Sequence, residues 1–451
     1  MVRAAKYWLI VLSRPAFATS SRKIASASCT IFTFSAANGF TRLLGFGLRL
    51  VLARLMGAEA LGVMEMVHSV EMLALTPVTA GTPTAMSRLT AQAAPEKRSA
   101  VLKAGLTAVF RISCMLMPVM AALAPMIAYL FGDMRTLPIL LINVPCILLL
   151  GLGSVYNGYC YGQQQMALPA INECVEQLSR CLISVILLVW LRKASTGVIA
   201  AIPCTAELLA AGIVVIIFAV RISVRKLFSS PDRALMQELT GLAAPVVVGR
   251  LCTTGLRTFN AFLIPACLRL SGLSASASTT QYGLMTGMAM PVLMLPGILT
   301  GALSMAAAPA VTAREHDVIQ LNSLILRLRR LSFLIGMASA AGIAALSDFI
   351  SDTLYATPAL AGLLRMMAPL ALLMAMQQVQ HGVIHGLALQ RRQLTGSLIG
   401  AAVTTVLTAL LAVRPQMRLY GVGVAMIIGQ LVTFVWGWRL VSLELRNVLT
   451  T

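Results

Sequence analysis

Charged side chains are scarce in this sequence. Only 11% of its 451 residues are Asp, Glu, Lys or Arg, whereas 58% are hydrophobic, and the mean hydropathy is +0.86. A water-soluble globule of this length needs a much larger charged surface, so that class of protein is excluded. The composition predicts a polytopic membrane protein.

Recognisable catalytic and metal-binding groupings are also absent. The sequence has no paired nucleophile and base and no glycine-rich phosphate loop, so we expect no enzyme, no catalytic residue and no cofactor. Nine cysteines lie mostly within apolar runs, without C-x-x-C spacing. His381 and His385 stand four residues apart but have no acidic neighbour, so we predict no metal site.

Apolar runs of about 20 residues recur along the whole chain, and in lipid each must form a helix because nothing else satisfies its backbone. The expected spans are 24–55, 60–88, 104–131, 138–160, 169–191, 197–220, 241–270, 280–312, 331–347, 358–388, 394–413 and 421–441. The predicted fold is an all-α integral membrane protein with about 12 transmembrane helices.

The net charge of +20 follows the loops between these runs, which argues against a nucleic-acid partner. If the N-terminus is cytoplasmic, the outside segments hold only five cations: Arg135, Arg192, Lys193, Arg414 and Arg418. This asymmetry is typical of the positive-inside rule and predicts that both termini are cytoplasmic.

An internal repeat divides the chain into two halves. Arg42, Leu43, Gly47, Leu48 and Arg49 recur as Arg250, Leu251, Gly255, Leu256 and Arg257, at a constant offset of 208 residues. Because six helices separate the copies, the repeats are expected to be parallel, with a central cavity between them. The expected segments are an interfacial leader (1–23), an N-terminal six-helix bundle (24–221), a cytoplasmic linker (222–240), a C-terminal six-helix bundle (241–442) and a cytoplasmic tail (443–451).

Arginines occupy the same repeated positions in both halves. Arg42 and Arg49 share one face of the first span, and Arg250 and Arg257 share one face of the seventh, because seven residues make about two helical turns. Each arginine at mid-bilayer costs roughly 2.5 to 3.5 kcal/mol, so we expect all four to line a wet, substrate-binding cavity. The planar guanidinium of arginine binds phosphate oxygens through two parallel hydrogen bonds, so we predict an anionic cargo that carries phosphate.

Acidic residues within the spans are candidates for ion coupling or for structural ion pairs. Glu65 and His68 are three apart on one helix, where they either carry a coupling proton or, as we favour, the acid pairs with a neighbouring arginine, which reduces the cost of membrane insertion. Glu176 and Arg180, with Glu173 nearby, predict a structural ion pair, and a coupling role for Glu176 stays open. Glu207 has no local partner in its own helix and is a further coupling candidate.

A set of motifs carries a family resemblance over nearly the whole chain. These are TRLLGF from Thr41, LARLMGAEALG from Leu52, TAGTPTAMSRL from Thr79, GYCYGQQQMALPAI from Gly158, VEQLSR from Val175, YGLMTGMAMPVLMLPGILTGAL from Tyr282 and HGVIHGL from His381. The chain resembles the stage V sporulation protein B family, in the superfamily that includes lipid II flippases and multidrug extruders. Many members have fourteen helices, whereas twelve are expected here.

The resemblance implies a flippase of the bacterial cytoplasmic membrane. Its expected cargo is an undecaprenyl-pyrophosphate-linked saccharide, such as a peptidoglycan precursor for spore cortex or another polysaccharide unit. A substrate-facing role carries over to Arg42 alone, within the R-x-L-G-F motif. Membrane lipids and a cell-wall or polysaccharide synthase are the other expected partners. Two alternatives stay open: a cation-coupled multidrug antiporter, and a non-transporting partner of such a synthase.

Overall fold

A computed structural model describes residues 21–221, 233–314 and 317–450 of the chain. Side chains are described within these ranges except at 21–38, 40, 42, 221, 318 and 446–450. Most of the predicted leader, and residues 222–232 of the predicted linker, therefore lie outside the described residues.

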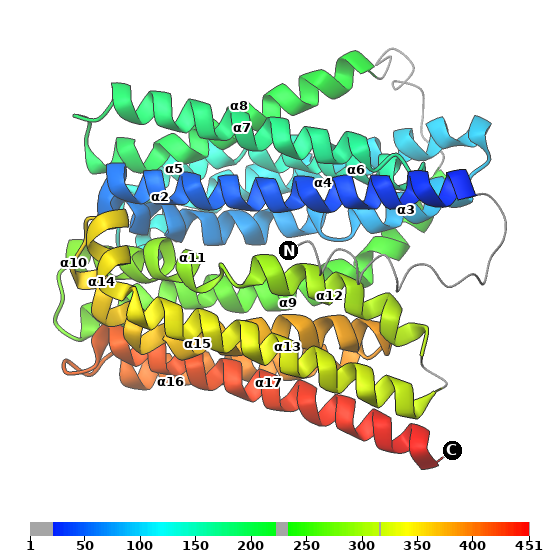
Figure 1. The fold of residues 1–451 in the computed structure, drawn as a ribbon. Helices are drawn as coiled ribbons and strands as arrows, with labels where there is room; N and C mark the ends of the chain where they lie inside the picture. Colours follow the sequence, from blue (N-terminus) through cyan, green and yellow to red (C-terminus); the bar gives the residue numbers. More distant parts are fainter. Residues whose placement is uncertain (1–20, 222–232, 315–316, 451) are drawn as a thin grey trace.

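The described chain is a bundle of long helices (Figure 1). The first group is α2 (Ser21–Thr79), α3 (Thr82–Gln92), η1 (Pro95–Lys97), α4 (Arg98–Phe131), α5 (Thr136–Asn143), α6 (Cys146–Gly162), α7 (Ala167–Trp190) and α8 (Thr196–Arg221). The second is α9 (Arg233–Leu270), α10 (Ala275–Gly283), η3 (Leu284–Ala289), α11 (Met290–Leu293), α12 (Gly297–Thr312), α13 (Val318–Ala345), α14 (Ser347–Phe349), η4 (Ile350–Leu354), α15 (Ala359–Gly386), α16 (Gln390–Leu411) and α17 (Arg418–Thr450). Figure 1 shows the first group above the second.

Eight helices of the described residues are long and apolar enough to cross a membrane, and α10 to α12 form a ninth candidate that is bent by 55°. The predicted spans 24–55, 60–88 and 169–191 are not among them. Each of these three spans carries three charged residues, as does 241–270, which is within a candidate span; in α7 the three, Glu173, Glu176 and Arg180, lie near the middle of the helix. The structure thus establishes a multi-helix membrane bundle, and the number of twelve spans stays a prediction.

Glycine and proline mark the points where the long helices break. Gly57 divides α2 into two helices, and its φ of 76° lies in the left-handed region that favours glycine. Pro77 precedes the break between α2 and α3, and Pro296 precedes α12 after the bend. The interruptions therefore lie in corresponding parts of the two halves, as the repeat predicts.

The two halves meet through close backbone contact between α2 and α10. A methyl group on Gly283 would clash with the carbonyl oxygen of Ala58, and one on Gly62 would clash with the carbonyl oxygen of Thr279. Farther along α2, the Thr258 hydroxyl donates a 2.7 Å hydrogen bond to the Ser69 carbonyl oxygen. Because Gly62 and Gly283 lack side chains, the two backbones can approach directly.

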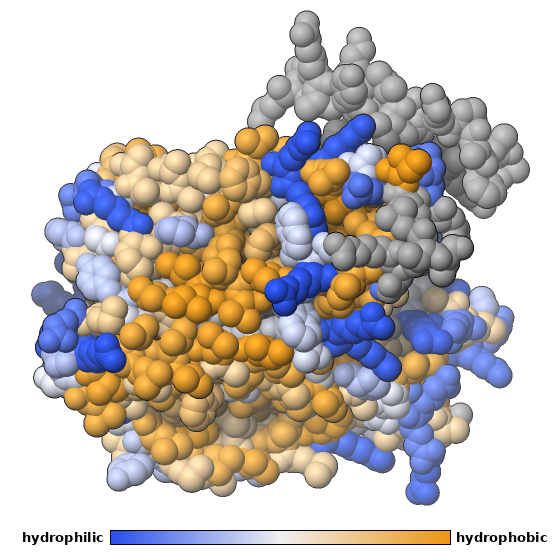
Figure 2. Space-filling model, turned by 90° about the horizontal axis from the view of Figure 1, so that it is seen from below, coloured by the Kyte–Doolittle hydropathy of each residue, from blue (hydrophilic) through white to orange (hydrophobic). Residues whose placement is uncertain are grey.

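The loops define two ends of this bundle. We call the end that holds the turns 132–135 and 271–274 the Asp133 end; the C-terminus lies at the opposite end (Figure 1). Figure 2 shows a broad apolar surface on the face of the C-terminal helices, with hydrophilic side chains gathered toward its two sides. This distribution is the one expected for a bundle whose middle contacts lipid.

Gly283→Ala should destabilise the protein by about 1–3 kcal/mol, because the added methyl group overpacks the contact with α2. Gly212→Ala is the matched control, since a methyl group at Gly212 in α8 meets nothing within 4 Å. Thermal unfolding of both variants in detergent checks the difference. Equal melting temperatures would contradict the proposed role of the glycine contact.

Candidate functional site

The described members of the predicted arginine set lie on α2 and α9. Arg250 and Arg257 are exposed on α9, and neither has a carboxylate within 4 Å among the described residues. Arg49 is partly exposed on α2. The Arg42 side chain lies outside the described residues, so its predicted role has no structural test.

Arg49 is paired with an acid, which the predicted cavity of four cations did not include. Its Nη1 lies 3.1 Å from Oε1 of Glu65, which lies on the second helix of α2, after the Gly57 break. The neighbouring Leu48 belongs to the same hydrophobic core as Tyr282 and Tyr355 of the C-terminal half. The Arg49–Glu65 pair therefore lies on a helix that packs against the opposite half.

A second polar cluster lies inside the N-terminal half, between α2, α7 and α8. Nδ1 of His68 lies 3.2 Å from Oε2 of Glu71, and Nη1 of Arg180 lies 3.3 Å from Oε1 of Glu207. Arg180 also donates to Oε1 of Gln177. One ligand atom each from His68, Glu71 and Glu207 lies within 4.8 Å of the others. We call His68, Glu71 and Glu207 the acidic cluster.

The acidic cluster has the donors of a cation site or a proton site. Glu71 is only 3% exposed and, with buried Asn143 of α5, lines a small cavity. Carboxylate oxygens and a neutral imidazole are suitable ligands for a metal cation, and two carboxylates this close favour sharing a proton. The sequence predicted no metal site; the contact with Glu207, 136 residues after Glu71, is made only in the folded bundle.

The structure corrects two predicted pairings. His68 contacts Glu71 rather than Glu65, because Glu65 turns to Arg49. Arg180 contacts Glu207 of α8, whereas within the described residues no ion pair joins it to Glu173 or Glu176. Glu207, for which the sequence offered no local partner, is therefore paired. Glu71 was missed as a candidate because it and Glu65 both stand three residues from His68.

A polar network joins the two halves at the Asp133 end. Arg135 donates to Asp133 and, over 2.8 Å, to Oε1 of Glu59, which also accepts a 2.7 Å hydrogen bond from the Ser276 hydroxyl of α10. Arg269 of α9 donates to the carbonyl oxygen of Phe131. The Ser276 hydrogen bond, and after it Arg135, lower the pKa of Glu59, which is therefore ionised at neutral pH. The bonds of Ser276 and Arg269 join the two halves at the Asp133 end.

Comparison of the sequence with known proteins identifies the family of this chain. A family model described as polysaccharide biosynthesis protein matches residues 30–314. The chain is also 31% identical, over 415 residues, to stage V sporulation protein B of Bacillus subtilis (strain 168), covering 87% of this chain and 79% of the relative. The chain belongs to the polysaccharide biosynthesis protein family. The resemblance found in the sequence motifs is thereby confirmed.

Solved structures agree with this family at the level of the fold. The structure of a lipid II flippase in an inward closed conformation matches with a TM-score of 0.70 and 14% identity, covering 92% of this chain and 90% of that one. An inward-facing multidrug transporter matches with a TM-score of 0.69 and 16% identity, covering 92% and 96%. The chain therefore shares the multi-helix membrane fold of these two transporters.

Arg180→Ala should lower stability by up to about 3 kcal/mol, because Glu207 then keeps its charge beside Glu71 without its cation. The cost is below that of a fully buried pair, since the Arg180 side chain is 30% exposed. Arg180→Ala combined with Glu207→Gln should be milder than Arg180→Ala alone. Melting temperatures in detergent test this, with Glu176→Gln as a nearly neutral control; a double change worse than the sum of the singles contradicts the pairing.

Proposed function

We propose that this protein moves an undecaprenyl-pyrophosphate-linked saccharide, a peptidoglycan precursor or another polysaccharide unit, across the bacterial cytoplasmic membrane. Family membership and the 31% identity to stage V sporulation protein B support this cargo class. The observation that carries the proposal is the repeated arginine pattern, with Arg250 and Arg257 exposed on α9 and Arg49 on α2. Spore cortex is the proposed setting.

The arginines form the proposed binding site for the pyrophosphate. Arg250 and Arg257 lack a carboxylate within 4 Å in the described part of the chain, so their positive charge remains available to an anion. At mid-bilayer, exposure to lipid would cost roughly 2.5 to 3.5 kcal/mol for each of them, so a wet path between the halves is the less costly environment. Arg42 completes the proposed site. Glu65 reduces the positive charge near Arg49 and holds its side chain in position.

Alternating access between two parallel six-helix halves is the proposed mechanism. We propose twelve spans with both termini in the cytoplasm, which places the Asp133 end outside. The contacts of Glu59 with Ser276 and of Arg269 with Phe131 then hold the outer side closed. Release of the cargo to the outer leaflet requires these bonds to break while the halves approach at the opposite end.

Changing Arg250 or Arg257 to Ala should weaken substrate binding about tenfold or more, because each charge-assisted hydrogen bond to phosphate contributes roughly 1.5–3 kcal/mol. Lys should recover only part of the loss, since it keeps the charge but loses the bidentate fork. The measurement is binding and flipping of a lipid-linked pyrophosphate saccharide by purified protein in vesicles. Arg54→Ala, an exposed arginine outside the repeated pairs, is the matched control.

Complementation identifies the cargo. Rescue of a strain depleted of its lipid II flippase supports a peptidoglycan precursor, whereas rescue only of a strain lacking an exopolysaccharide flippase moves the assignment to another polymer. Drug resistance without either rescue would replace the proposal with the multidrug antiporter. If the Arg250→Ala, Arg257→Ala double variant rescues growth as well as the unchanged protein does, transport would be ruled out as the basis of the rescue. That result would favour a non-transporting partner of a synthase.

We also propose that the acidic cluster couples transport to a cation or proton gradient. Its position inside the N-terminal half, with Arg180 bound to Glu207, allows protonation or cation binding to change how α2, α7 and α8 pack. His68 and Glu207 belong to this cluster, and Glu176 lies within electrostatic reach of Arg180 and Glu207, so it also stays a coupling candidate. Glu65, which pairs with Arg49, stays a candidate through its electrostatic effect on His68.

Glu71→Gln should abolish the stimulation of flipping by an imposed pH or sodium gradient. Substrate counterflow needs no driving ion, so its rate should stay within about twofold of that of the unchanged protein, a difference well below the tenfold change that corresponds to about 1.4 kcal/mol. Glu173→Gln is the control, because Glu173 is half-buried on α7 and outside the cluster. A Glu71→Gln variant that responds fully to the gradient would assign the cluster to structure alone.

A further inference from the structure

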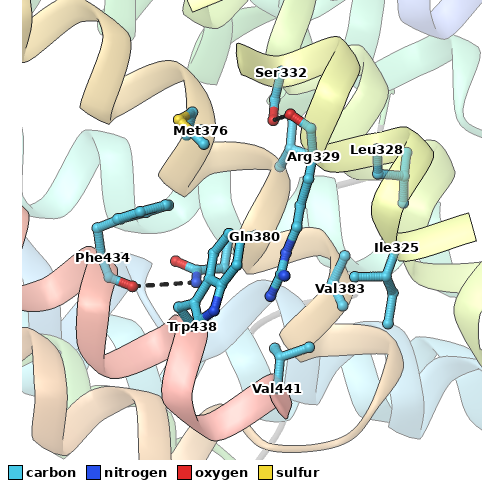
Figure 3. A pocket seen from close by; sticks show the side chains of 11 residues that line it. Ile325, Leu328, Arg329, Ser332, Met376, Gln380, Val383, Phe434, Trp438 and Val441 are labelled. Carbon is cyan, nitrogen blue, oxygen red and sulfur yellow. Dashed lines mark hydrogen bonds between the residues drawn. The ribbon is translucent and has the colours of Figure 1, made fainter. Parts of the chain in front are cut away.

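A groove between α13, α15 and α17 holds an arginine that the transport mechanism does not use (Figure 3). The Arg329 guanidinium carbon lies 3.1 Å from the centroid of the Trp438 ring. Within the described chain, no carboxylate lies within 4 Å of Arg329. Stacking on an aromatic ring leaves the edge of a guanidinium, with its N–H donors, free for a planar anion.

The rest of the groove is apolar apart from a few polar groups. Val383 and Val441 flank the guanidinium, and Met376 and Phe434 line the groove farther along (Figure 3). Nε2 of Gln380 donates to the Phe434 carbonyl oxygen over 3.3 Å. One cation beside an aliphatic lining is complementary to an amphipathic anion, with its charged group on the guanidinium and its chain along the groove.

The depth of Arg329 favours a lipid headgroup over a free anion. No charged residue occurs between Leu331 and Leu346, and the helix from Arg329 to Ala345 extends roughly 24 Å at 1.5 Å per residue. That length is close to the thickness of a hydrocarbon core, about 30 Å. Arg329 therefore lies near one boundary of the hydrocarbon, where the phosphates of one leaflet are found.

Charge around the groove favours an anionic lipid over a zwitterionic one. Two exposed arginines of α13, Arg327 and Arg330, lie within two residues of Arg329 in the sequence. Arg439 of α17, which directly follows Trp438, is also exposed. None of the three has a carboxylate within 4 Å in the described ranges. Clustered basic residues at a membrane boundary attract anionic headgroups, and basic pockets between helices bind them specifically.

We propose that this groove is a binding site for an anionic phospholipid, distinct from the transport path. Arg329, oriented by Trp438, binds the phosphate, and one acyl chain lies against the aliphatic lining of α13, α15 and α17. The bound lipid joins three helices of the C-terminal half at one membrane boundary. The site is independent of the cargo, because it lies within one half and contains none of the repeated arginines.

The test measures lipid-dependent stabilisation of the detergent-purified full chain. Phosphatidylglycerol should raise the melting temperature of the unchanged protein and of Arg233→Ala, which removes the same charge from an exposed position at the start of α9, outside the groove and its basic residues. In Arg329→Ala the apparent affinity for phosphatidylglycerol should fall about tenfold, and Arg329→Lys should be intermediate. Because each variant is compared with and without lipid, a lower starting stability does not mimic the result.

Three outcomes would overturn the proposal. Equal stabilisation of Arg329→Ala and Arg233→Ala by phosphatidylglycerol would reduce the effect to general surface charge. Phosphatidylcholine acting as strongly as phosphatidylglycerol would exclude selection for an anionic lipid. Inorganic phosphate producing the same stabilisation at millimolar concentration would assign Arg329 to a free anion.

Discussion

The energetic cost of a charge in a low-dielectric interior governs how this protein is built. Transfer of an unpaired ion out of water costs several kcal/mol even after relaxation, so buried acids need partners. Glu65 contacts Arg49, Glu71 contacts His68 and Glu207 contacts Arg180. The Arg49–Glu65 and Arg180–Glu207 contacts also fix the relative position of helix segments that lipid alone would not hold together, because apolar surfaces gain little from one another in a bilayer.

The same constraint gives meaning to the cations that remain without acids. The chain has 35 Lys and Arg for 15 Asp and Glu, so many arginines have no acidic partner. Those in loops reach water directly. Arg250 and Arg257 on α9, and Arg329 against Trp438, lie on membrane helices and need an anion or water from another source. The proposed cargo would supply the negative charge for Arg250 and Arg257, and the proposed lipid would supply it for Arg329.

Features that depend on local sequence could be predicted well. Apolar runs located most helices, and the motif set identified the family. The partners of the charged residues in ion pairs could not be predicted, because the spacing along one helix can fit two different acidic residues equally well. His68 stands three residues from both Glu65 and Glu71, and only the packing of α2 decides between them. Arg180 finds Glu207, 27 residues away, and Arg135 finds Glu59, 76 residues away, which no local pattern reports.

The glycine contact between α2 and α10 lies close to the hydrogen bonds of the Asp133 end, since Gly62 follows Glu59 by three residues and Thr279 follows Ser276 by three. In the proposed alternating-access cycle this contact separates together with those bonds. Interdigitated side chains resist shear, because each must leave a close-fitting space before the surfaces can move. Backbone resting on backbone at Gly62 and Gly283 has less to disengage at that point. The bonds of Glu59 with Ser276 and Arg135 are partly exposed and are screened by dissolved ions. The ionic strength of the medium at that end is therefore expected to act on the speed of the proposed cycle, separately from any effect on affinity.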